Sequence, residues 1–206
     1  MAPGVLVIIV SKGNDRHPCI DGSVLINFKK IASPITMAFK NSPMRKKSTI
    51  DKDAEKTSTI FVPLAVTSSG LNNKGYLGLQ YTCDGANINP SLDIAGIPKD
   101  AKSLAIIMED PDAPGGRFIH WIAWNIAVGS HIKEAHPMEG EGLNDFRMLG
   151  YRGPCPSYGT HHYVFNVYAF DTLLELRQDT REPELKAAMD GHILGFGKLA
   201  GLYKRK

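Results

Sequence analysis

The stretch FIHWIAWNI, residues 118–126, decides the fold class of this chain. Side chains alternate between the two faces of a β-strand, and here both alternating sets are mostly apolar. A strand of this kind is buried on both faces, so it belongs to a sandwich or to a sheet that other elements cover. The stretch therefore predicts a mainly β protein with a covered strand.

Three further apolar runs have the length of strands, at residues 60–67, 104–108 and 163–170. Short segments rich in Gly, Pro, Asn, Asp and Ser separate the runs, as is typical of an all-β domain. Only residues 181–190 indicate a helix, because Pro183 stands near the start and apolar side chains then recur at helical spacing.

The charge pattern divides the chain in two. Residues 40–58 are charged and polar, which predicts an N-terminal extension and basic linker at 1–58 and a domain at 59–206. Between residues 40 and 56, Lys and Arg exceed Asp and Glu by three, which equals the formal net charge of +3 of the whole chain. The domain itself carries no excess of positive charge, so we expect no nucleic-acid partner.

Cysteines and apolar runs indicate the compartment. The spacing of Cys19, Cys83 and Cys155 fits neither a disulfide framework nor a zinc site. We interpret them as free thiols of a protein in a reducing compartment. Whether Cys83 and Cys155 lie close together in the fold stays open. No apolar run approaches the ~20 residues of a membrane span. Residues 5–10 are apolar but lack the flanks of a signal peptide. We expect a cytoplasmic protein without an integral membrane segment, and a degraded export signal is the alternative.

A polar segment, EDPDAP at residues 109–114, follows the apolar run 104–108. Its prolines end the strand and hold Asp110 and Asp112 in a stiff loop. Alone, this pattern is most often a plain turn.

His120 lies eight residues beyond Asp112, and a hairpin of the two strands places it near both carboxylates. By strict alternation His120 shares a face with Ile122 and Trp124. A single histidine on an apolar face is more often a satisfied core residue than a ligand.

The segment GPCPSYGTHHY, residues 153–163, combines a loop rich in Gly and Pro with the start of a strand. His161 and Tyr163 share one face of that strand, and His162 points to the other. Backbone near Gly153 lets a ligand approach N–H groups closely. With the two aspartates and His120, these groups suit an anion pocket or a metal site.

Other chemistries have less support. The chain lacks His-x-His, His-Glu-x-x-His and paired Cys spacings for a metal, and it lacks the patterns of a P-loop and a nucleophile elbow.

Taken together, these motifs resemble those of the phosphatidylethanolamine-binding protein (PEBP) family, within it the prokaryotic Raf-kinase-inhibitor-like branch. The resemblance covers roughly residues 59–206 and has two departures, Asn89-Pro90 in place of Ser-Pro and His162 in place of Arg. The matching stretches are YTCDG at 81–85, NPSL at 89–92, DPDAP at 110–114, HW at 120–121, NDF at 144–146, GYRGPCP at 150–156, GTHHY at 159–163 and GHIL at 191–194.

The resemblance implies a β-sandwich of two antiparallel sheets with Greek-key connections and a C-terminal helix. It also implies a pocket for small anions such as phosphate or a phospholipid head group, without cofactor or metal. Matched residue by residue, this pocket consists of Asp110, Asp112, His120, Gly153, Pro154, His161 and Tyr163.

We therefore expect a non-enzymatic binding protein in which His120, His161 and Tyr163 donate hydrogen bonds to the anion. The aspartates would orient the histidines and favour their protonation, so that affinity rises as the pH falls. A metal-assisted or acid/base hydrolase that uses the same residues is the alternative. Eukaryotic members regulate kinases, and some members are linked to protease inhibition, so a kinase or protease partner and a homodimer stay open.

Overall fold

The computed structural model describes residues 61–205. The predicted extension and linker at 1–58 and Cys19 lie outside the described residues. The strands are β1 Val62–Pro63, β2 Ala65–Thr67, β3 Leu92–Ala95, β4 Ser103–Asp110, β5 Phe118–Ile126, β6 His131–Ile132, β7 Gly140–Glu141, β8 His161–Phe170 and β9 Ile193–Tyr203, and the helices are α1 Glu182–Met189 and a short 3-10 turn at Leu79–Tyr81.

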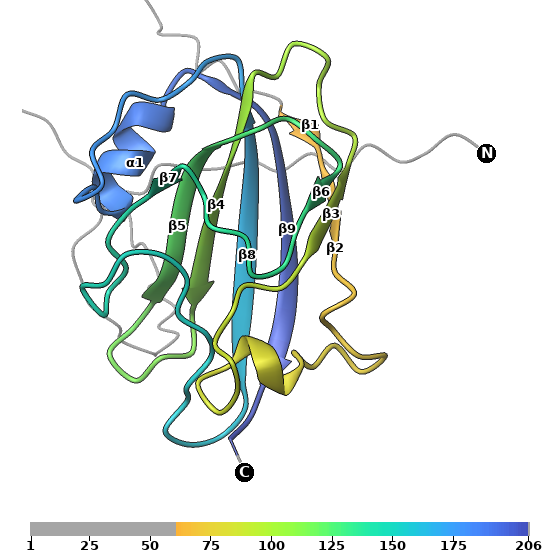
Figure 1. The fold of residues 1–206 in the computed structure, drawn as a ribbon, viewed down its shortest axis with the longest axis vertical. Coiled ribbons are helices and arrows are strands. Elements are labelled where there is room, and N and C mark those ends of the chain that lie inside the picture. Colours follow the sequence, from red (N-terminus) through yellow and green to blue (C-terminus); the bar gives the residue numbers. More distant parts are fainter. Residues whose placement is uncertain (1–60, 206) are drawn as a thin grey trace, which may run out of the picture. The chain divides into compact units, whose positions relative to one another are not determined.

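The strands form two sheets. A six-stranded sheet has the order β1-β9-β8-β4-β5-β7, and a three-stranded sheet has the order β2-β3-β6. Figure 1 shows β4, β5, β8 and β9 side by side, with the short strands β2, β3 and β6 along one side. Every pairing is antiparallel except that of β1 with β9, which is parallel. The prediction of a mainly β fold with two sheets and one helix is confirmed.

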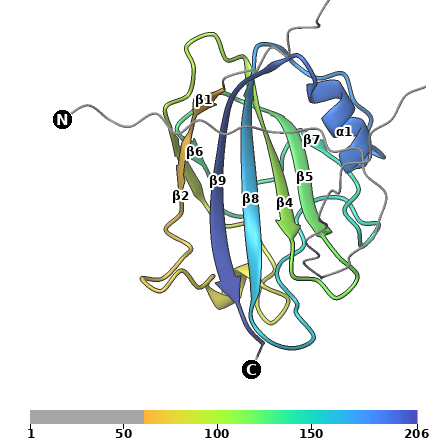
Figure 2. The same cartoon turned by 180° about the vertical axis from the view of Figure 1, so that it is seen from behind.

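The strands β4 and β5 of the large sheet are buried on both faces, as the composition of residues 118–126 predicts. On one face, Trp121 of β5 and Phe165 of β8 share a core with Leu92 and Ile132 of the small sheet. On the other face, apolar residues of β4 and β5 pack against α1, whose Leu185 is fully buried. This part of the sheet therefore lies between the small sheet and α1, whereas β8 and β9 have no helix over them in Figure 2.

The helix does not end the chain. The eleven-residue strand β9 follows α1 and pairs with β8 along its whole length. Its sequence, ILGFGKLAGLY, was not recognised as a strand because three glycines interrupt the apolar alternation. Gly197 shows why they stand there, since a Cβ atom at this position would lie 2.3 Å from the carbonyl oxygen of Leu64. Within residues 61–205 no helix is long and apolar enough to cross a membrane.

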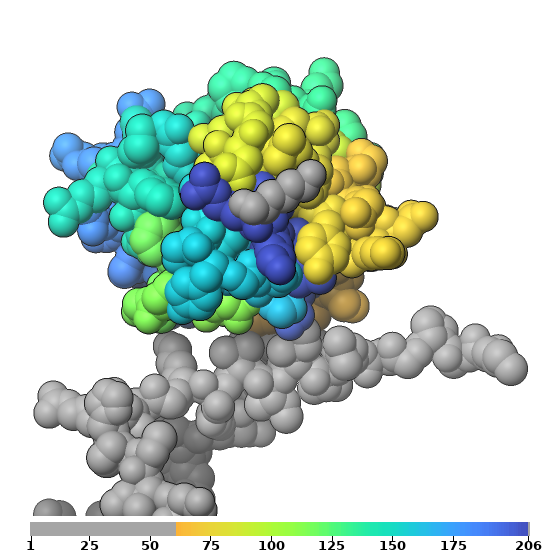
Figure 3. Space-filling view, turned by 90° about the horizontal axis from the view of Figure 1, so that it is seen from below, coloured from red at the N-terminus to blue at the C-terminus, as the bar shows by residue number. Residues whose placement is uncertain are grey.

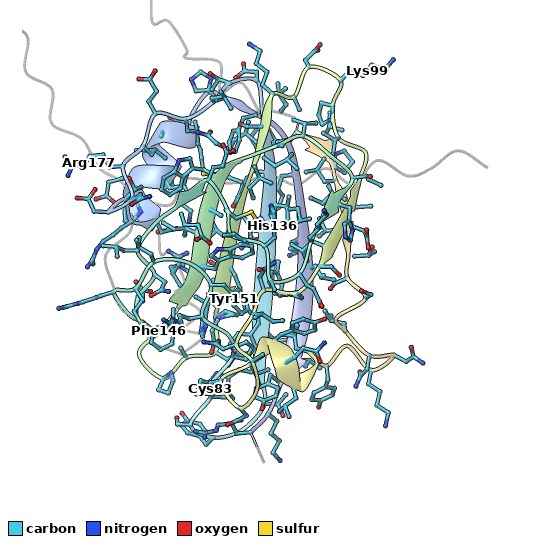
Figure 4. The ribbon with its side chains drawn as sticks, viewed as in Figure 1. Cys83, Lys99, His136, Phe146, Tyr151 and Arg177 are labelled. Carbon is cyan, nitrogen blue, oxygen red and sulfur yellow. A yellow bond between two sulfur atoms is a disulfide. The ribbon has the colours of Figure 1, made fainter. Side chains whose placement is uncertain are left out.

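The interpretation of Cys83 and Cys155 as free thiols was wrong. The two residues form a disulfide, with Cα atoms 5.4 Å apart and a sequence separation of 72. It joins the loop after the 3-10 turn to the loop before β8. Figure 4 labels Cys83 in the lower part of the view, at the end of the domain where β9 ends. Nothing local in the sequence brings these loops together, because their contact depends on the packing of the two sheets.

Candidate functional site

A cavity of about 170 Å³ opens where β4 ends and where β5 and β8 begin. Figure 3 looks onto this end of the domain, where the cyan segment around residue 155 lies beside the green segment around residue 115. Polar side chains that line the cavity are Asp110, His120, Ser157, His161 and Tyr163, and the other lining residues are Ala113, Pro114, Phe118, Phe146, Cys155 and Pro156.

The pairing of β4 with its two neighbours explains why distant residues meet here. Asp110 is the last residue of β4 and pairs with Phe118 of β5, while Glu109 pairs with Val164 of β8. The polar ends of three adjacent strands therefore converge at one edge of the sheet. The hairpin predicted from the spacing of Asp112 and His120 is confirmed.

An irregularity in β5 turns His120 toward the cavity. Met108 pairs with Trp121 and Glu109 pairs with Ile119, so His120 is an extra residue opposite β4, a β-bulge. The prediction that His120 shares a face with Ile122 and Trp124 was therefore wrong. Those two side chains lie in the core under α1, whereas the His120 ring contacts the Tyr163 ring at a centroid distance of 5.2 Å.

Asp110 and His161 form a buried pair. The Nδ1 atom of His161 lies 2.7 Å from Oδ2 of Asp110, and each residue is only 4% exposed. Because an ionised carboxylate only accepts hydrogen bonds, Nδ1 of His161 carries a proton that it donates to Asp110. The other Asp110 oxygen accepts the backbone N–H of Asp112 at 2.8 Å. Asp110 thus fixes the orientation of the His161 ring.

His120 is held by backbone on the other side of the cavity. Its Nδ1 lies 2.7 Å from the carbonyl oxygen of Arg152, and the N–H of Arg152 donates in return to the carbonyl of His120. Burial lowers the pKa of His120, although the hydrogen bond to Arg152 and the charge of Asp110 oppose this shift. The imidazole is therefore neutral at neutral pH.

Tyr163 lies between these groups with its hydroxyl unpaired. The side chain is completely buried, and its oxygen makes no hydrogen bond of normal geometry within the described residues, although Asp110 and the backbone of Cys155 lie near it. Burial, together with the negative charge of Asp110, raises the pKa of Tyr163 well above its usual value, so the hydroxyl stays protonated. A buried hydroxyl without a partner costs about 1–3 kcal/mol, which is typical of a group that meets a ligand.

Asp112 does not line the cavity. One of its carboxylate oxygens accepts hydrogen bonds from both the backbone N–H and the Nδ1 of His162, each at 2.7 Å. These bonds lower the pKa of Asp112. His162 itself is exposed and stands outside the lining, as the alternation along β8 predicts.

Gly153 and Pro154 support the cavity wall from behind. The N–H of Gly153 donates to the side-chain oxygen of Asn87 at 2.7 Å, and the carbonyl of Pro154 accepts the N–H of Cys83. A Cβ atom on residue 153 would lie 2.2 Å from the carbonyl oxygen of Tyr81, so only glycine fits. The structure brings together four of the seven predicted pocket residues on the cavity surface and places Asp112, Gly153 and Pro154 outside it.

Aromatic residues at the mouth of the cavity were not predicted as site residues. The ring of Phe146, labelled in Figure 4, packs against those of Phe118 and His120 at centroid distances of 4.7 and 5.4 Å. Tyr158, 67% exposed, contacts the ring of His161. The sequence did contain a signal for Phe146, because the neighbouring Asp145 fits the family pattern. The carboxylate of Asp145 accepts a hydrogen bond from the backbone N–H of Ile119.

The part of the chain that the structure describes contains no candidate metal site. Residues 61–205 contain no group of three or more His, Cys, Asp or Glu side chains that could hold a metal ion. The cavity offers two imidazoles, one carboxylate and two hydroxyls for hydrogen bonding.

Sequence comparisons point to one family. The model of the phosphatidylethanolamine-binding protein family matches residues 67–204. A UPF0098 protein of Pyrococcus abyssi is 50% identical over 150 residues, which cover 68% of this chain and 84% of the relative. A UPF0098 protein of Chlamydia trachomatis is 36% identical over 149 residues, which cover 69% of this chain and 99% of the relative.

Solved structures agree with these matches. The crystal structure of a PEBP homologue from Chlamydia trachomatis has a TM-score of 0.67 and 35% identity, covering 70% of this chain and 99% of its own. The structure of E. coli YbcL, described as a member of the mammalian PEBP family, has a TM-score of 0.63 and 27% identity, covering 69% of this chain and 99% of its own. With the fold and the sequence in agreement, the chain belongs to the phosphatidylethanolamine-binding protein family.

Proposed function

We propose that the protein is a non-enzymatic binding protein whose cavity takes a small anion, either free phosphate or the phosphate of a phospholipid head group. The observation that carries this proposal is the unpaired, buried hydroxyl of Tyr163 at a cavity that His120 and His161 also line. Each imidazole has its Nδ1 engaged, by Arg152 and Asp110 respectively. Each therefore has its second ring nitrogen left for a ligand.

The size of the cavity supports a small ligand. A volume of about 170 Å³ corresponds to roughly six waters at ~30 Å³ each. Cavities that bury drug-sized molecules are larger, about 300–1,000 Å³. A phosphate group fits this space, and a head group could enter with its phosphate while the rest of the lipid stays outside.

The carboxylate of Asp110 is compatible with an anion only through His161. A free carboxylate would repel the ligand, but one oxygen of Asp110 is engaged by Nδ1 of His161 and the other accepts the backbone N–H of Asp112. Asp112 is already satisfied by His162 and does not face the cavity. The contact with His161 supports the expectation for Asp110, which orients a histidine of the cavity, whereas Asp112 orients His162 outside it.

The neighbourhood of the cavity also supports contact with a larger partner. Phe146, Met148 and Leu149 belong to one loop, and each is exposed despite its apolar side chain. Neighbouring exposed apolar residues often mark interaction surfaces. We propose that a kinase or protease partner contacts this loop and is sensitive to occupation of the cavity.

Calorimetric titration tests the anion proposal. We expect heat on adding inorganic phosphate or phosphoethanolamine, and we expect Asp110→Asn and His161→Ala to weaken binding about tenfold or more, because hydrogen bonds to charged groups contribute about 1.5–3 kcal/mol. His192→Asn is the matched control, because it removes an exposed His–Asp pair beyond the other end of β8. The absence of binding by the wild-type protein, or equal losses in the control, would contradict the proposal.

A further inference from the structure

We infer that His120 makes the cavity selective for an oxyanion that carries a proton, such as hydrogen phosphate or a phosphate monoester, over sulfate and phosphate diesters. This inference rests on the proposed anion binding and narrows it. The phosphate of an intact phospholipid is a diester, so free phosphate or a phosphate monoester is the favoured ligand. It follows from the direction of the hydrogen bonds around His120.

The hydrogen bond to Arg152 determines which nitrogen of His120 carries the proton. A backbone carbonyl oxygen only accepts, so the Nδ1 atom 2.7 Å away must donate. In a neutral imidazole the other nitrogen, Nε2, then has a lone pair and no proton. His120 therefore accepts a hydrogen bond from whatever lies in the cavity. The sequence alone indicated the opposite role, that of a donor.

The surroundings of His120 keep it in this state. Phe118, Phe146 and Tyr163 pack edge to face against its ring, with centroid distances between 5.2 and 5.4 Å. Turning the ring over would give up the bond to Arg152 and disturb all three contacts. The negative charges of Asp110 and Asp145 favour a second proton, but the desolvation of the ring outweighs them and lowers the pKa of His120.

His161 also has a ring nitrogen left for the ligand, because its Nδ1 donates to Asp110. The hydroxyl of Tyr163 can donate or accept, and the rings of both histidines contact the Tyr163 ring. A P–OH group would face His120, and the Tyr163 hydroxyl would donate to an unprotonated oxygen of the ligand.

A ligand without a proton cannot satisfy this arrangement. Sulfate has the same shape as phosphate but no proton near neutral pH, so its oxygen would set a lone pair against the lone pair of His120 Nε2. The dimethyl phosphate anion likewise has no proton that it could donate to Nε2 of His120. A buried polar group left without its partner typically weakens binding tenfold or more. We therefore expect phosphate to bind at least about ten times more tightly than sulfate.

Titration of the full chain with four anions tests the inference. Inorganic phosphate, methyl phosphate, sulfate and dimethyl phosphate are compared at about pH 6, where a phosphate monoester is roughly half singly protonated. We expect the first two to bind and the last two to bind at least tenfold more weakly. Equal affinity for phosphate and sulfate would overturn the inference but leave the anion proposal standing. Binding of none of the four would overturn both.

Two variants of His120 connect the selectivity to this residue. His120→Phe keeps an aromatic ring against Phe118 and Tyr163, and His120→Asn keeps a donor for Arg152, but neither has the Nε2 lone pair. We expect the ratio of phosphate to sulfate affinity to fall to about one in either variant that stays folded. His131→Asn, which alters an exposed His–Asp pair outside the cavity lining, should keep the wild-type ratio. A wild-type ratio in both His120 variants would overturn the assignment.

Discussion

Tyr163 combines complete burial with an unpaired hydroxyl. Its ring belongs to the main core, between the two sheets, while its oxygen finds no partner in the described residues. A group of this kind lowers the stability of the empty protein, and a ligand that pairs with it restores the loss. The same atom is thus expected to act on stability and on binding in opposite directions.

Tyr163→Phe should separate these two effects. Without ligand the variant should be as stable as the wild type or up to about 1 kcal/mol more stable, because the change removes a buried group that had no partner. Its affinity for phosphate should fall several-fold. Urea denaturation in phosphate-free buffer measures the first effect, and titration measures the second. A variant that is less stable and binds normally would show that the hydroxyl has a structural role instead.

His120 should make the stability of the empty protein depend on pH. Burial lowers its pKa below the 6.5 of an unperturbed histidine, so the unfolded chain binds this proton more readily than the folded protein does. The contribution of neutral His120 to the free energy of unfolding is therefore fully present above about pH 6.5. It is lost as the pH falls from there toward the lowered pKa of the folded protein.

Denaturation at several pH values between about 7.5 and 5.5 measures this loss. The free energy of unfolding of the wild type should decrease over this range, and the decrease should be shallower in His120→Asn. His131→Asn should retain the wild-type slope, since His131 is exposed. Identical slopes in the wild type and His120→Asn would rule out His120 as the source.

At the scale of the elements, the wall of the cavity depends on one loop and its covalent connection. Residues 153–157 precede β8 and hold to the loop around Cys83 through the disulfide and through the bonds of Gly153 and Pro154. Cys155 lines the cavity itself. Opening the disulfide should therefore loosen the wall and lower the stability together.

Cys83→Ala combined with Cys155→Ala should lower the free energy of unfolding by about 2–4 kcal/mol, because the bridge spans 72 residues and restricts the unfolded chain. Guanidinium denaturation with and without a thiol reductant measures the loss. Both cysteines are exposed, so the reduced wild type should match the double variant. Equal stability of the oxidised wild type and the double variant would argue against the bridge.

At the scale of the whole molecule, binding in the cavity should stabilise the complete domain. The lining residues come from β4, β5, β8 and the loops between them, so the ligand binds only when these elements are assembled. Phosphate at a hundred times its dissociation constant should raise the free energy of unfolding by about 2.7 kcal/mol.

A series of melting temperatures against phosphate concentration measures this gain. Potassium chloride at matched ionic strength is the control for general salt effects. The gain should fall to about 1.4 kcal/mol or less in Asp110→Asn, as a tenfold loss of affinity predicts, and should persist in His192→Asn. A rise in melting temperature that is the same in potassium chloride would speak against specific binding.

Much of this protein could be predicted from local patterns. Residues 118–126 are apolar on both faces because the strand lies between two layers, and the helix at 182–189 shows its apolar stripe and its proline. The strand β9 could not be predicted because its glycines interrupt the apolar alternation of a strand. These glycines accommodate the close approach of another chain segment, a requirement that exists only in the folded state.

The sequence by itself determined the class of fold, the family, and which side chains gather at the ends of β4 and β8. These depend on the period of two along a strand and on residue types, which are local properties. The tertiary structure alone decided that Cys83 and Cys155 are joined, that Asp112 serves His162, and that a bulge turns His120 toward Tyr163. It also decided that His120 accepts a hydrogen bond, because its proton goes to a carbonyl 32 residues away in the chain. Contacts of such separation are set by the packing of the sheets.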